Sequence, residues 1–257
     1  MHSLHAGFRY FRAGAGKVCR QFQSYGRRAW MRRERIGAYA AYSQHGPQCL
    51  HIGAEGFAIP GWFNTDLDPQ ADGIYYLDAT LPFPFPDASF DFVFSEHMIE
   101  HIPFGDGMKM LAECRRVLKP GGVIRTATPN LLNILSLISK SNGHEAYLNW
   151  ATEQFKLPKA PFPKAPGVIN HFFRAWGHQF IYDPEMLQKA LEQSGFDDVI
   201  HCEIGESRHV TLRGLERHGD RWTPWINEFE TMILEATVPG GHSAMDASVE
   251  TIVAGKA

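Results

Sequence analysis

The sequence has few cysteines and no long hydrophobic run. Only four of its 257 residues are cysteine, and no two of them form a C-x-x-C pair. Neither a disulfide framework nor a thiolate zinc site is therefore indicated. No apolar run reaches the length of about eighteen residues that a membrane span needs, and the N-terminus has Arg and Gly where a secretory signal would be continuously apolar. We expect a cytoplasmic protein with reduced thiols.

The sequence also has no internal repeat, which argues against a solenoid or a propeller. With 44% hydrophobic residues it can bury a sizeable core, and its length suits one α/β domain with insertions. We divide it into a basic helical extension (1–47), a main domain (48–238) and a tail (239–257). Within the main domain, residues 131–180 depart from the strand-and-helix rhythm and are rich in proline, so we expect an inserted lid or acceptor region there.

Acidic residues are almost missing from the N-terminal segment. Residues 1–48 carry nine Lys or Arg side chains against Glu34 alone, so that segment is +8 and the remainder −11 within a net charge of −3. Such a segment suits contact with an anionic membrane surface or an acidic partner, and no strong nucleic-acid signal accompanies it. Because its apolar residues between Val18 and Ala29 recur at helical spacing, a solvated helix that packs on its own domain is the simpler expectation.

Short apolar runs that end in Gly, Asp or Ser recur from residue 49 onward. They predict five strands between residues 49 and 130, with a helix over 104–118 that ends at the Lys119–Gly122 segment. A helix over 184–194, capped by Asp183, precedes a sixth strand from 197 and a seventh near 229–238. We therefore predict an α/β fold with a doubly wound, seven-stranded Rossmann-like sheet and helices on both faces. Ligands of such sheets bind at the carboxyl ends of the strands.

Residues 97–101 read HMIEH, which matches the inverted zinc-protease pattern H-x-x-E-H. That site needs a well-formed helix to hold both histidines. Here the motif follows a strand directly and Pro103 comes two residues later, which leaves about one helical turn. A zinc hydrolase is therefore a minor alternative, and we expect no metal.

Four successive strand ends carry residues suited to a nucleoside ligand. The glycine loop from Gly53 to Gly56 would admit a ligand carboxylate to backbone N–H groups at a helix N-terminus. Asp66, thirteen residues after Gly53, is placed to bind a ribose diol. In a dinucleotide dehydrogenase the acidic residue lies about twenty residues after the glycine loop, so Asp66 comes too early for that class of enzyme. Asp78 suits an adenine amino group. The candidate cofactor-binding residues are Gly53, Ala54, Glu55, Gly56, Asp66, Leu67, Asp78, Ala79, Ser95, Glu96 and His97.

Over residues 48–237 the chain resembles the class I S-adenosyl-L-methionine-dependent methyltransferases, in particular small predicted ones found with surface-glycan genes. The matching pieces are LHIGAEGFAIPGWFNTDLDP, LDATLPFPFPDASFDFVFSEHMIEHI, ECRRVLKPGGVIRTATPN and GHQFIYDPEMLQKALEQSGFDDV. The resemblance implies that the first loop holds the methionine part of S-adenosyl-L-methionine, that Asp66 holds its ribose and that Asp78 and Ala79 lie at its adenine. It also implies methyl transfer to a hydroxyl of a glycan, a glycan precursor or another small molecule.

Glu55 departs from the G-x-G loop of that family, since it stands at the second glycine. Its carboxylate could repel the cofactor carboxylate or hold the cofactor ammonium group, and the displaced Gly56 would then provide the close backbone approach. A noncatalytic methyltransferase-like binding or scaffold protein is therefore the main alternative. A hydroxyl acceptor also calls for a base, and the candidates are His97, His101, His171 and His178.

Overall fold

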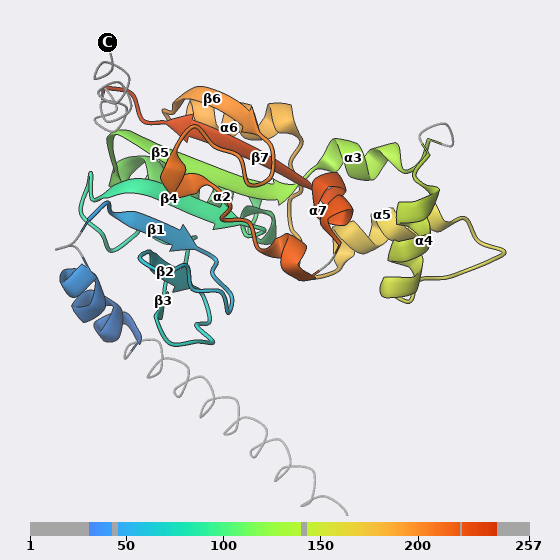
Figure 1. Ribbon diagram of the computed structural model, residues 1–257, viewed down its shortest axis with the longest axis horizontal. Coiled ribbons are helices and arrows are strands. Elements are labelled where there is room, and N and C mark those ends of the chain that lie inside the picture. Colours follow the sequence, from blue (N-terminus) through green and yellow to red (C-terminus); the bar gives the residue numbers. More distant parts are fainter. Residues whose placement is uncertain (1–30, 43–45, 140–142, 222, 241–257) are drawn as a thin grey trace, which may run out of the picture.

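The structure is a computed structural model that describes residues 31–42, 46–139, 143–221 and 223–240 (Figure 1). Within the predicted extension 1–47, residues 31–42 form a helix. The rest of that prediction, and the short strand considered for the tail, lie outside the described residues. None of the helices in these ranges is long and apolar enough to cross a membrane.

Seven strands form one sheet in the order β3-β2-β1-β4-β5-β7-β6. They are β1 (Cys49–Ile52), β2 (Phe63–Asp66), β3 (Ile74–Tyr76), β4 (Phe90–Glu96), β5 (Leu118–Pro129), β6 (Asp197–Cys202) and β7 (Thr231–Thr237). Neighbouring strands pair in parallel from β3 to β5, and β7 runs antiparallel between β5 and β6. The predicted seven-stranded Rossmann-like α/β fold is confirmed.

The remaining elements connect and cover these strands. The helices are α2 (Phe104–Val117), α3 (Leu131–Ser136), α4 (Glu145–Gln154), α5 (Lys164–Arg174), α6 (Pro184–Gln193) and α7 (Pro224–Glu230), with 3-10 turns η1 (Ile99–His101), η2 (Val210–Leu212) and η3 (His218–Arg221). As predicted, Asp183 caps α6, since its Oδ1 accepts a 2.7 Å bond from the N–H of Met186.

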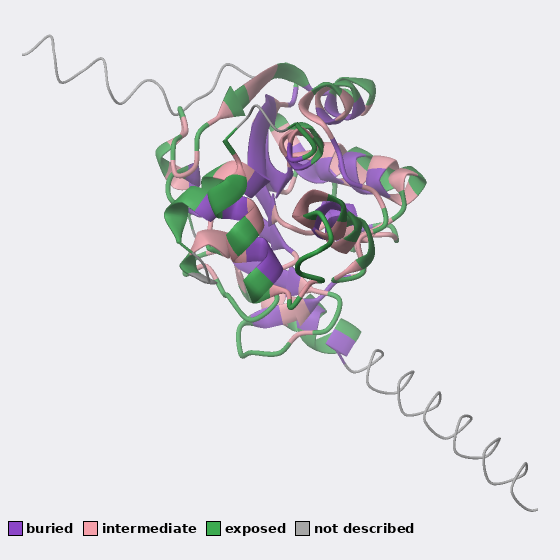
Figure 2. Cartoon of the chain, turned by 90° about the vertical axis from the view of Figure 1, so that its right-hand side faces the viewer, coloured by how far each residue is buried: buried purple, intermediate pink, exposed green. Residues whose placement is uncertain are grey.

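One face of the sheet carries most of the core. Apolar residues of α2 recur every three or four positions, and together with α6 they cover the buried side chains of β1, β4 and β7. The helix over 31–42 packs on the same cluster, where the Tyr39 ring lies 4.9 Å from that of Phe85. Figure 2 shows the buried residues concentrated in the strands and on the inner sides of the helices.

The opposite face is covered by the segment that joins β6 to β7. Leu212 of η2 and Leu215 pack there on Phe92 and Phe94 of β4. Arg125 of β5 holds this segment in place: its side chain is fully buried and lies 2.6 Å from a Glu216 oxygen and 2.5 Å from a Glu235 oxygen. Its guanidinium also donates to the carbonyl of Glu206 at 2.8 Å. We call Arg125, Glu216 and Glu235 the Arg125 cluster.

Two local predictions were wrong. Between residues 49 and 96 the strands from β1 to β4 follow one another without an intervening α-helix, so the first loop does not open a helix. The Lys119–Gly122 segment does not stand between helix and strand, because α2 ends at Val117 and β5 begins at Leu118. A Cβ at Gly122 would lie 2.9 Å from the Lys119 carbonyl, so this glycine permits the bend at the start of β5.

The region over 131–180 contains three helices, α3, α4 and α5. They share a second core, in which Ile134, Tyr147 and Val168 are buried, and Ile226 of α7 joins it. Figure 1 shows these helices beyond the end of the sheet where β5 ends and β7 begins. The region is thus a folded unit at the carboxyl ends of the parallel strands.

Candidate functional site

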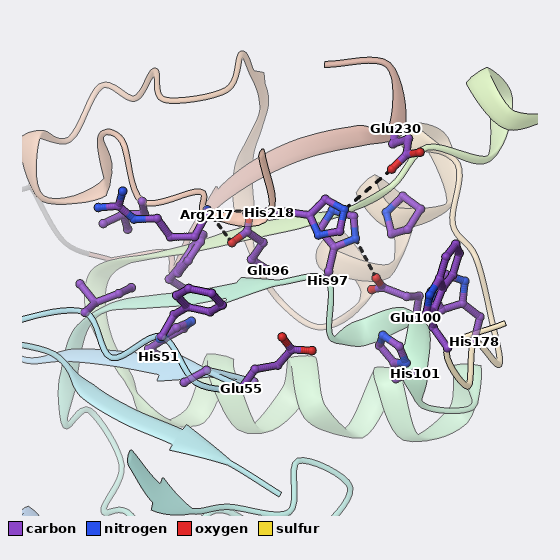
Figure 3. A pocket seen from close by; sticks show the side chains of 18 of the residues that line it. His51, Glu55, Glu96, His97, Glu100, His101, His178, Arg217, His218 and Glu230 are labelled. Atoms are coloured by element: carbon purple, nitrogen blue, oxygen red, sulfur yellow. Dashed lines mark hydrogen bonds and ion pairs between the residues drawn. The ribbon is translucent and has the colours of Figure 1, made fainter. Parts of the chain in front are cut away.

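A cavity of about 320 Å³ lies at the carboxyl ends of β1, β4 and β5 (Figure 3). Its walls come from the loop after β1, the η1 segment, the helical region 131–180 and the segment before α7. The residues that line it are His51, Gly53, Ala54, Glu55, Phe57, Ile59, Phe94, Glu96, His97, Glu100, His101, Pro129, Phe155, Phe172, Trp176, His178, Leu215, Arg217, His218 and Glu230. This position agrees with the predicted ligand site at the strand ends.

The loop after β1 is held by its neighbour strand. The N–H groups of Gly53 and Ala54 both donate to the carbonyl of Thr65 at 2.9 Å, and the N–H of Glu55 donates to Asp66 Oδ2 at 2.8 Å. These donors are therefore used within the protein, and the predicted helix N-terminus that would present them to a ligand carboxylate does not exist. Gly53 has a φ of +79°, and a Cβ there would lie 2.5 Å from Met98 Cγ. Packing against Met98 is thus sufficient reason for glycine at this position.

Glu55 itself takes a backbone conformation that ordinarily favours glycine. Its φ is +47°, in the left-handed region, and Figure 3 shows its carboxylate directed into the cavity. Gly56 is exposed and does not line the cavity, and a Cβ added to it would meet no atom within 4 Å. The structure therefore shows no protein contact that requires glycine at position 56, and the role of Gly56 in close backbone approach stays a prediction.

The two predicted aspartates support turns beside the cavity. Asp66 Oδ1 accepts from the N–H of Asp68 at 2.8 Å, and its other oxygen holds Glu55. Asp78 Oδ1 accepts from the N–H and the hydroxyl of Thr80 at 3.1 and 2.7 Å. Each Asp66 oxygen keeps a second lone pair and Asp78 Oδ2 accepts neither of the Thr80 bonds, so these bonds are compatible with a further ligand contact.

The cavity brings together only part of the predicted cofactor site. Five of the predicted residues line it, namely Gly53, Ala54, Glu55, Glu96 and His97. The other six lie outside its lining, namely Gly56, Asp66, Leu67, Asp78, Ala79 and Ser95.

His97 lies at the centre of the cavity wall and uses both ring nitrogens. Its Nε2 is 2.9 Å from the hydroxyl of Thr231, which itself donates to Asn227 Oδ1, so the imidazole must donate here. Its Nδ1 is 3.2 Å from Glu100 Oε1. Burial opposes the charge on both partners, but their mutual hydrogen bond and attraction outweigh it, so the pKa of His97 is raised and the pKa of Glu100 is lowered. The raised pKa favours the charged form of His97, and with both ring nitrogens engaged it is not a vacant base.

A second imidazole, His218, stacks on His97 with ring centroids 3.8 Å apart. Its Nε2 lies 3.8 Å from a carboxylate oxygen of Glu230, and Tyr147 donates to the other oxygen of Glu230 at 2.5 Å. Burial and the charge of Glu230 both raise the pKa of Tyr147, which keeps that hydroxyl a donor. The side chain of Glu96 accepts from the backbone N–H of His218 at 3.0 Å and so fixes its position.

A third group joins the η1 segment to the helical region. Glu100, His101 and His178 each offer a ligand atom within 4.8 Å of the others, and Figure 3 shows them together on one side of the cavity. His178 Nδ1 lies 2.7 Å from the carbonyl of Phe172. Burial lowers the pKa of His178. Of the four predicted histidines, His171 alone does not line the cavity, and its ring stacks 4.5 Å from Phe155.

His51 of β1 closes the side opposite the helical region. Its Nδ1 lies 3.1 Å from Asn64 Oδ1 and its ring stacks on Phe94 at 5.3 Å. Burial lowers the pKa of His51 to about 4, so the ring is neutral near pH 7.

The zinc-protease pattern does not form the site that its letters describe. As predicted, only one turn follows β4, the 3-10 turn η1. The two histidines of HMIEH contact different partners. His97 stacks on His218, whereas the ring centroid of His101 lies 4.9 Å from that of His178.

Part of the chain is similar in sequence to known methyltransferases. A family model described as "Methyltransferase domain" matches residues 66–126. A probable S-adenosylmethionine-dependent methyltransferase of Mycolicibacterium smegmatis is 49% identical over 47 residues, which cover 18% of each chain. The match thus spans less than a fifth of the curated relative.

Two solved structures are similar to this chain at low identity. A SAM-dependent methyltransferase from Archaeoglobus fulgidus has a TM-score of 0.46 and 18% identity, and the alignment covers 82% of this chain and 92% of that one. An S-adenosylmethionine-dependent methyltransferase from Mesorhizobium loti has a TM-score of 0.43 and 15% identity, with 75% and 91% covered. Likenesses of this size carry no conclusion about substrate.

The family model matches residues 66–126 and the sheet is the predicted seven-stranded one, so this part of the chain is similar to the class I S-adenosyl-L-methionine-dependent methyltransferase family, as the sequence predicted. The methyl donor of that family is S-adenosyl-L-methionine.

Proposed function

We propose that this protein transfers a methyl group from S-adenosyl-L-methionine to a hydroxyl of a small molecule, such as a glycan or its precursor, bound in the cavity. The observation that carries the proposal is the position of the cavity at the ends of β1 and β4, where the loop after β1 and the helical region face each other across about 320 Å³. One wall suits the donor and the other an acceptor.

The residues present suit this cofactor. Its ammonium group and sulfonium are cationic, and the Glu55 carboxylate points into the cavity that would hold them. Arg217 also lines the cavity and offers a cation for the cofactor carboxylate. Apolar walls such as Phe57 and Phe94 suit the adenosyl part, with Asp66 directly behind the loop through its bond to Glu55. When bound, the cofactor supplies an electrophilic methyl group.

The protein would contribute mainly alignment. Holding donor and acceptor as a near-attack pair can supply about 7 to 11 kcal/mol, against about 3 to 5 kcal/mol from a general base. For the base we propose His218, which Glu230 orients at 3.8 Å. His97, with both nitrogens engaged, would hold His218 by stacking and is a positioning residue.

The acceptor wall supports a sugar-like substrate. Phe155, Phe172 and Trp176 of the helical region present aromatic rings to the cavity. The C–H face of a sugar ring packs well on such rings, while its hydroxyls need polar partners like the neighbouring histidines. The helical region 131–180 would thus act as the acceptor region.

Calorimetric titration with S-adenosylhomocysteine tests the proposal without knowledge of the acceptor. We expect one site per chain, with S-adenosyl-L-methionine competing for it and NAD failing to bind. Absence of binding would contradict the proposal and favour a noncatalytic binding or scaffold protein.

A further inference from the structure

We propose that Glu100, His101 and His178 form a binding site for a divalent transition-metal ion such as Zn²⁺ at the cavity wall. Their ligand atoms lie within 4.8 Å of one another, and all three side chains line the cavity. Two imidazoles and one carboxylate are a ligand set that zinc and other first-row metals use. The site differs from the H-x-x-E-H pattern, because His178 replaces His97 as the second imidazole.

The spacing of the three ligand atoms is close to what an ion needs. Tetrahedral zinc with bonds of about 2.0 to 2.1 Å places its ligands about 3.4 Å apart. The observed limit of 4.8 Å is larger than this, so an ion would draw the ligand atoms closer together. Three protein ligands also leave a coordination position open, as catalytic zinc sites do, and the cavity lies beside it.

Two of the ligands are oriented by further contacts, as metal ligands in proteins are. His178 Nδ1 donates to the Phe172 carbonyl at 2.7 Å, which leaves the Nε2 lone pair for an ion. Glu100 Oε2 accepts from the hydroxyl of Thr128 at 2.9 Å, and Oε1 is 3.2 Å from His97. The fully buried carboxylate is thus fixed from two sides.

The backbone joins the two halves of the site. The carbonyl of Glu100 accepts from the N–H of Gln179 at 2.8 Å, and the Gln179 side chain donates to the carbonyl of His101 at 2.6 Å. His178 is therefore held beside the η1 segment by bonds that do not involve an ion. The two halves of the site are thus already held side by side, which lowers the ordering cost of binding.

The ion would serve the acceptor, and this part of the inference rests on the proposed function. At the open position it would take an acceptor hydroxyl as ligand and lower the pKa of that hydroxyl, so that the oxygen loses its proton to a nearby base before attack. The ion neither gains nor loses electrons in this role.

Equilibrium dialysis of the full chain against Zn²⁺, followed by metal analysis, tests the site. We expect about one ion per chain in the wild type, and more than a hundredfold loss of affinity in His101→Ala and in His178→Ala, because ligand removal exceeds the roughly 10- to 100-fold effect of an outer-shell change. Thr128→Val should fall within that outer-shell range.

The matched control is His171→Ala. His171 and His178 both pack their rings near Trp176, at 4.6 and 5.4 Å, but His171 is outside the ligand set. This variant should keep wild-type affinity. A wild type that binds no Zn²⁺, or equal affinity in the His101, His178 and His171 variants, would overturn the site.

Thermal melts show whether each variant is folded and whether Zn²⁺ binds the folded state. Zn²⁺ should raise the Tm of the wild type and of His171→Ala, since an ion that binds only the folded state stabilises it. A His178→Gln variant that melts cooperatively but whose Tm does not respond to Zn²⁺ supports the assignment, and a full response overturns it. Titration with S-adenosylhomocysteine in the presence of EDTA separates the two proposals. If the protein binds S-adenosylhomocysteine but no zinc, only the metal site is overturned. If it binds zinc but no S-adenosylhomocysteine, only the proposed function is overturned.

Discussion

The Arg125 cluster and the cavity wall both bury ionised side chains, but they differ in what their polar atoms face. In the Arg125 cluster the guanidinium points at protein acceptors, the carboxylates of Glu216 and Glu235 and the Glu206 carbonyl. In the cavity wall, His97 and Glu100 are also buried as a pair, yet they border a cavity of about 320 Å³. A buried ion pair therefore marks structure where it is closed and a candidate site where it borders a cavity.

The largest effect on stability should come from removing the cation of the Arg125 cluster. Arg125→Met leaves Glu216 and Glu235 buried without their cation, which should lower the free energy of unfolding by about 3 to 5 kcal/mol in urea titrations. Lys189→Met is the control, since its partner Glu185 is exposed, and it should leave the urea midpoint unchanged. A similar midpoint for both variants would show that the cluster is not structural.

The next largest effect should be a loss of stability at low pH that comes from His51 in the cavity wall. Its pKa is lowered from 6.5 to about 4 in the folded state, so the unfolded chain takes up a proton that the folded chain refuses as the pH falls below 6.5. Between pH 7 and pH 4.5 the wild type should lose about 2 to 3 kcal/mol of stability relative to His51→Gln, which cannot titrate. Urea titrations at the two pH values measure this difference, and parallel losses in the two proteins would refute it.

Asp66→Ala should act on binding more than Asp78→Ala. Asp66 anchors the N–H of Glu55 in the cavity loop, whereas Asp78 bonds Thr80 within its own turn. We expect Asp66→Ala to weaken S-adenosylhomocysteine by about 1.5 to 3 kcal/mol and Asp78→Ala by about 0.5 to 1.5 kcal/mol, by calorimetry. The reverse order would mean that the loop after β1 does not hold the cofactor.

The smallest effect concerns the backbone of the cavity loop. Glu55→Gly removes a side chain from a left-handed φ of +47°, which should raise the free energy of unfolding by up to about 1 kcal/mol. Because it also removes the carboxylate that would face the cofactor ammonium group, it should weaken S-adenosylhomocysteine binding by up to about 1 kcal/mol. Gly56→Val, at an open position, should change neither quantity. Loss of affinity in Gly56→Val would show that Gly56 is the point of backbone approach.

The sequence predicted the strands well because they are short buried apolar runs between turn residues. β1 has the predicted bounds Cys49–Ile52, and β4 ends one residue past the predicted run. The connection after β1 was not predictable from the family pattern. Asn64 of β2 holds it through bonds to Ile59 and Trp62 at 2.8 to 3.1 Å, so the chain stays non-helical.

The cavity wall could be predicted only in part, because its partners are far apart in sequence. His97 and Thr231 are separated by 134 residues, and Tyr147 and Glu230 by 83. No local sequence spacing predicts His218 or Glu230. They lie at the cavity because β7 runs antiparallel, which puts the residues just before its start beside the carboxyl ends of the parallel strands. Glu96 and His97 do line the cavity, since their place follows from the end of β4 alone, and their contact with a cofactor stays a prediction.

A crystal structure of the full chain with S-adenosylhomocysteine tests the central claim most directly. The account predicts the ligand in the cavity, with its homocysteine part against the Gly53–Phe57 loop and its thioether facing the wall of His97 and His218. A ligand bound on another face of the sheet, or crystals that take up none at saturating concentration, would contradict it.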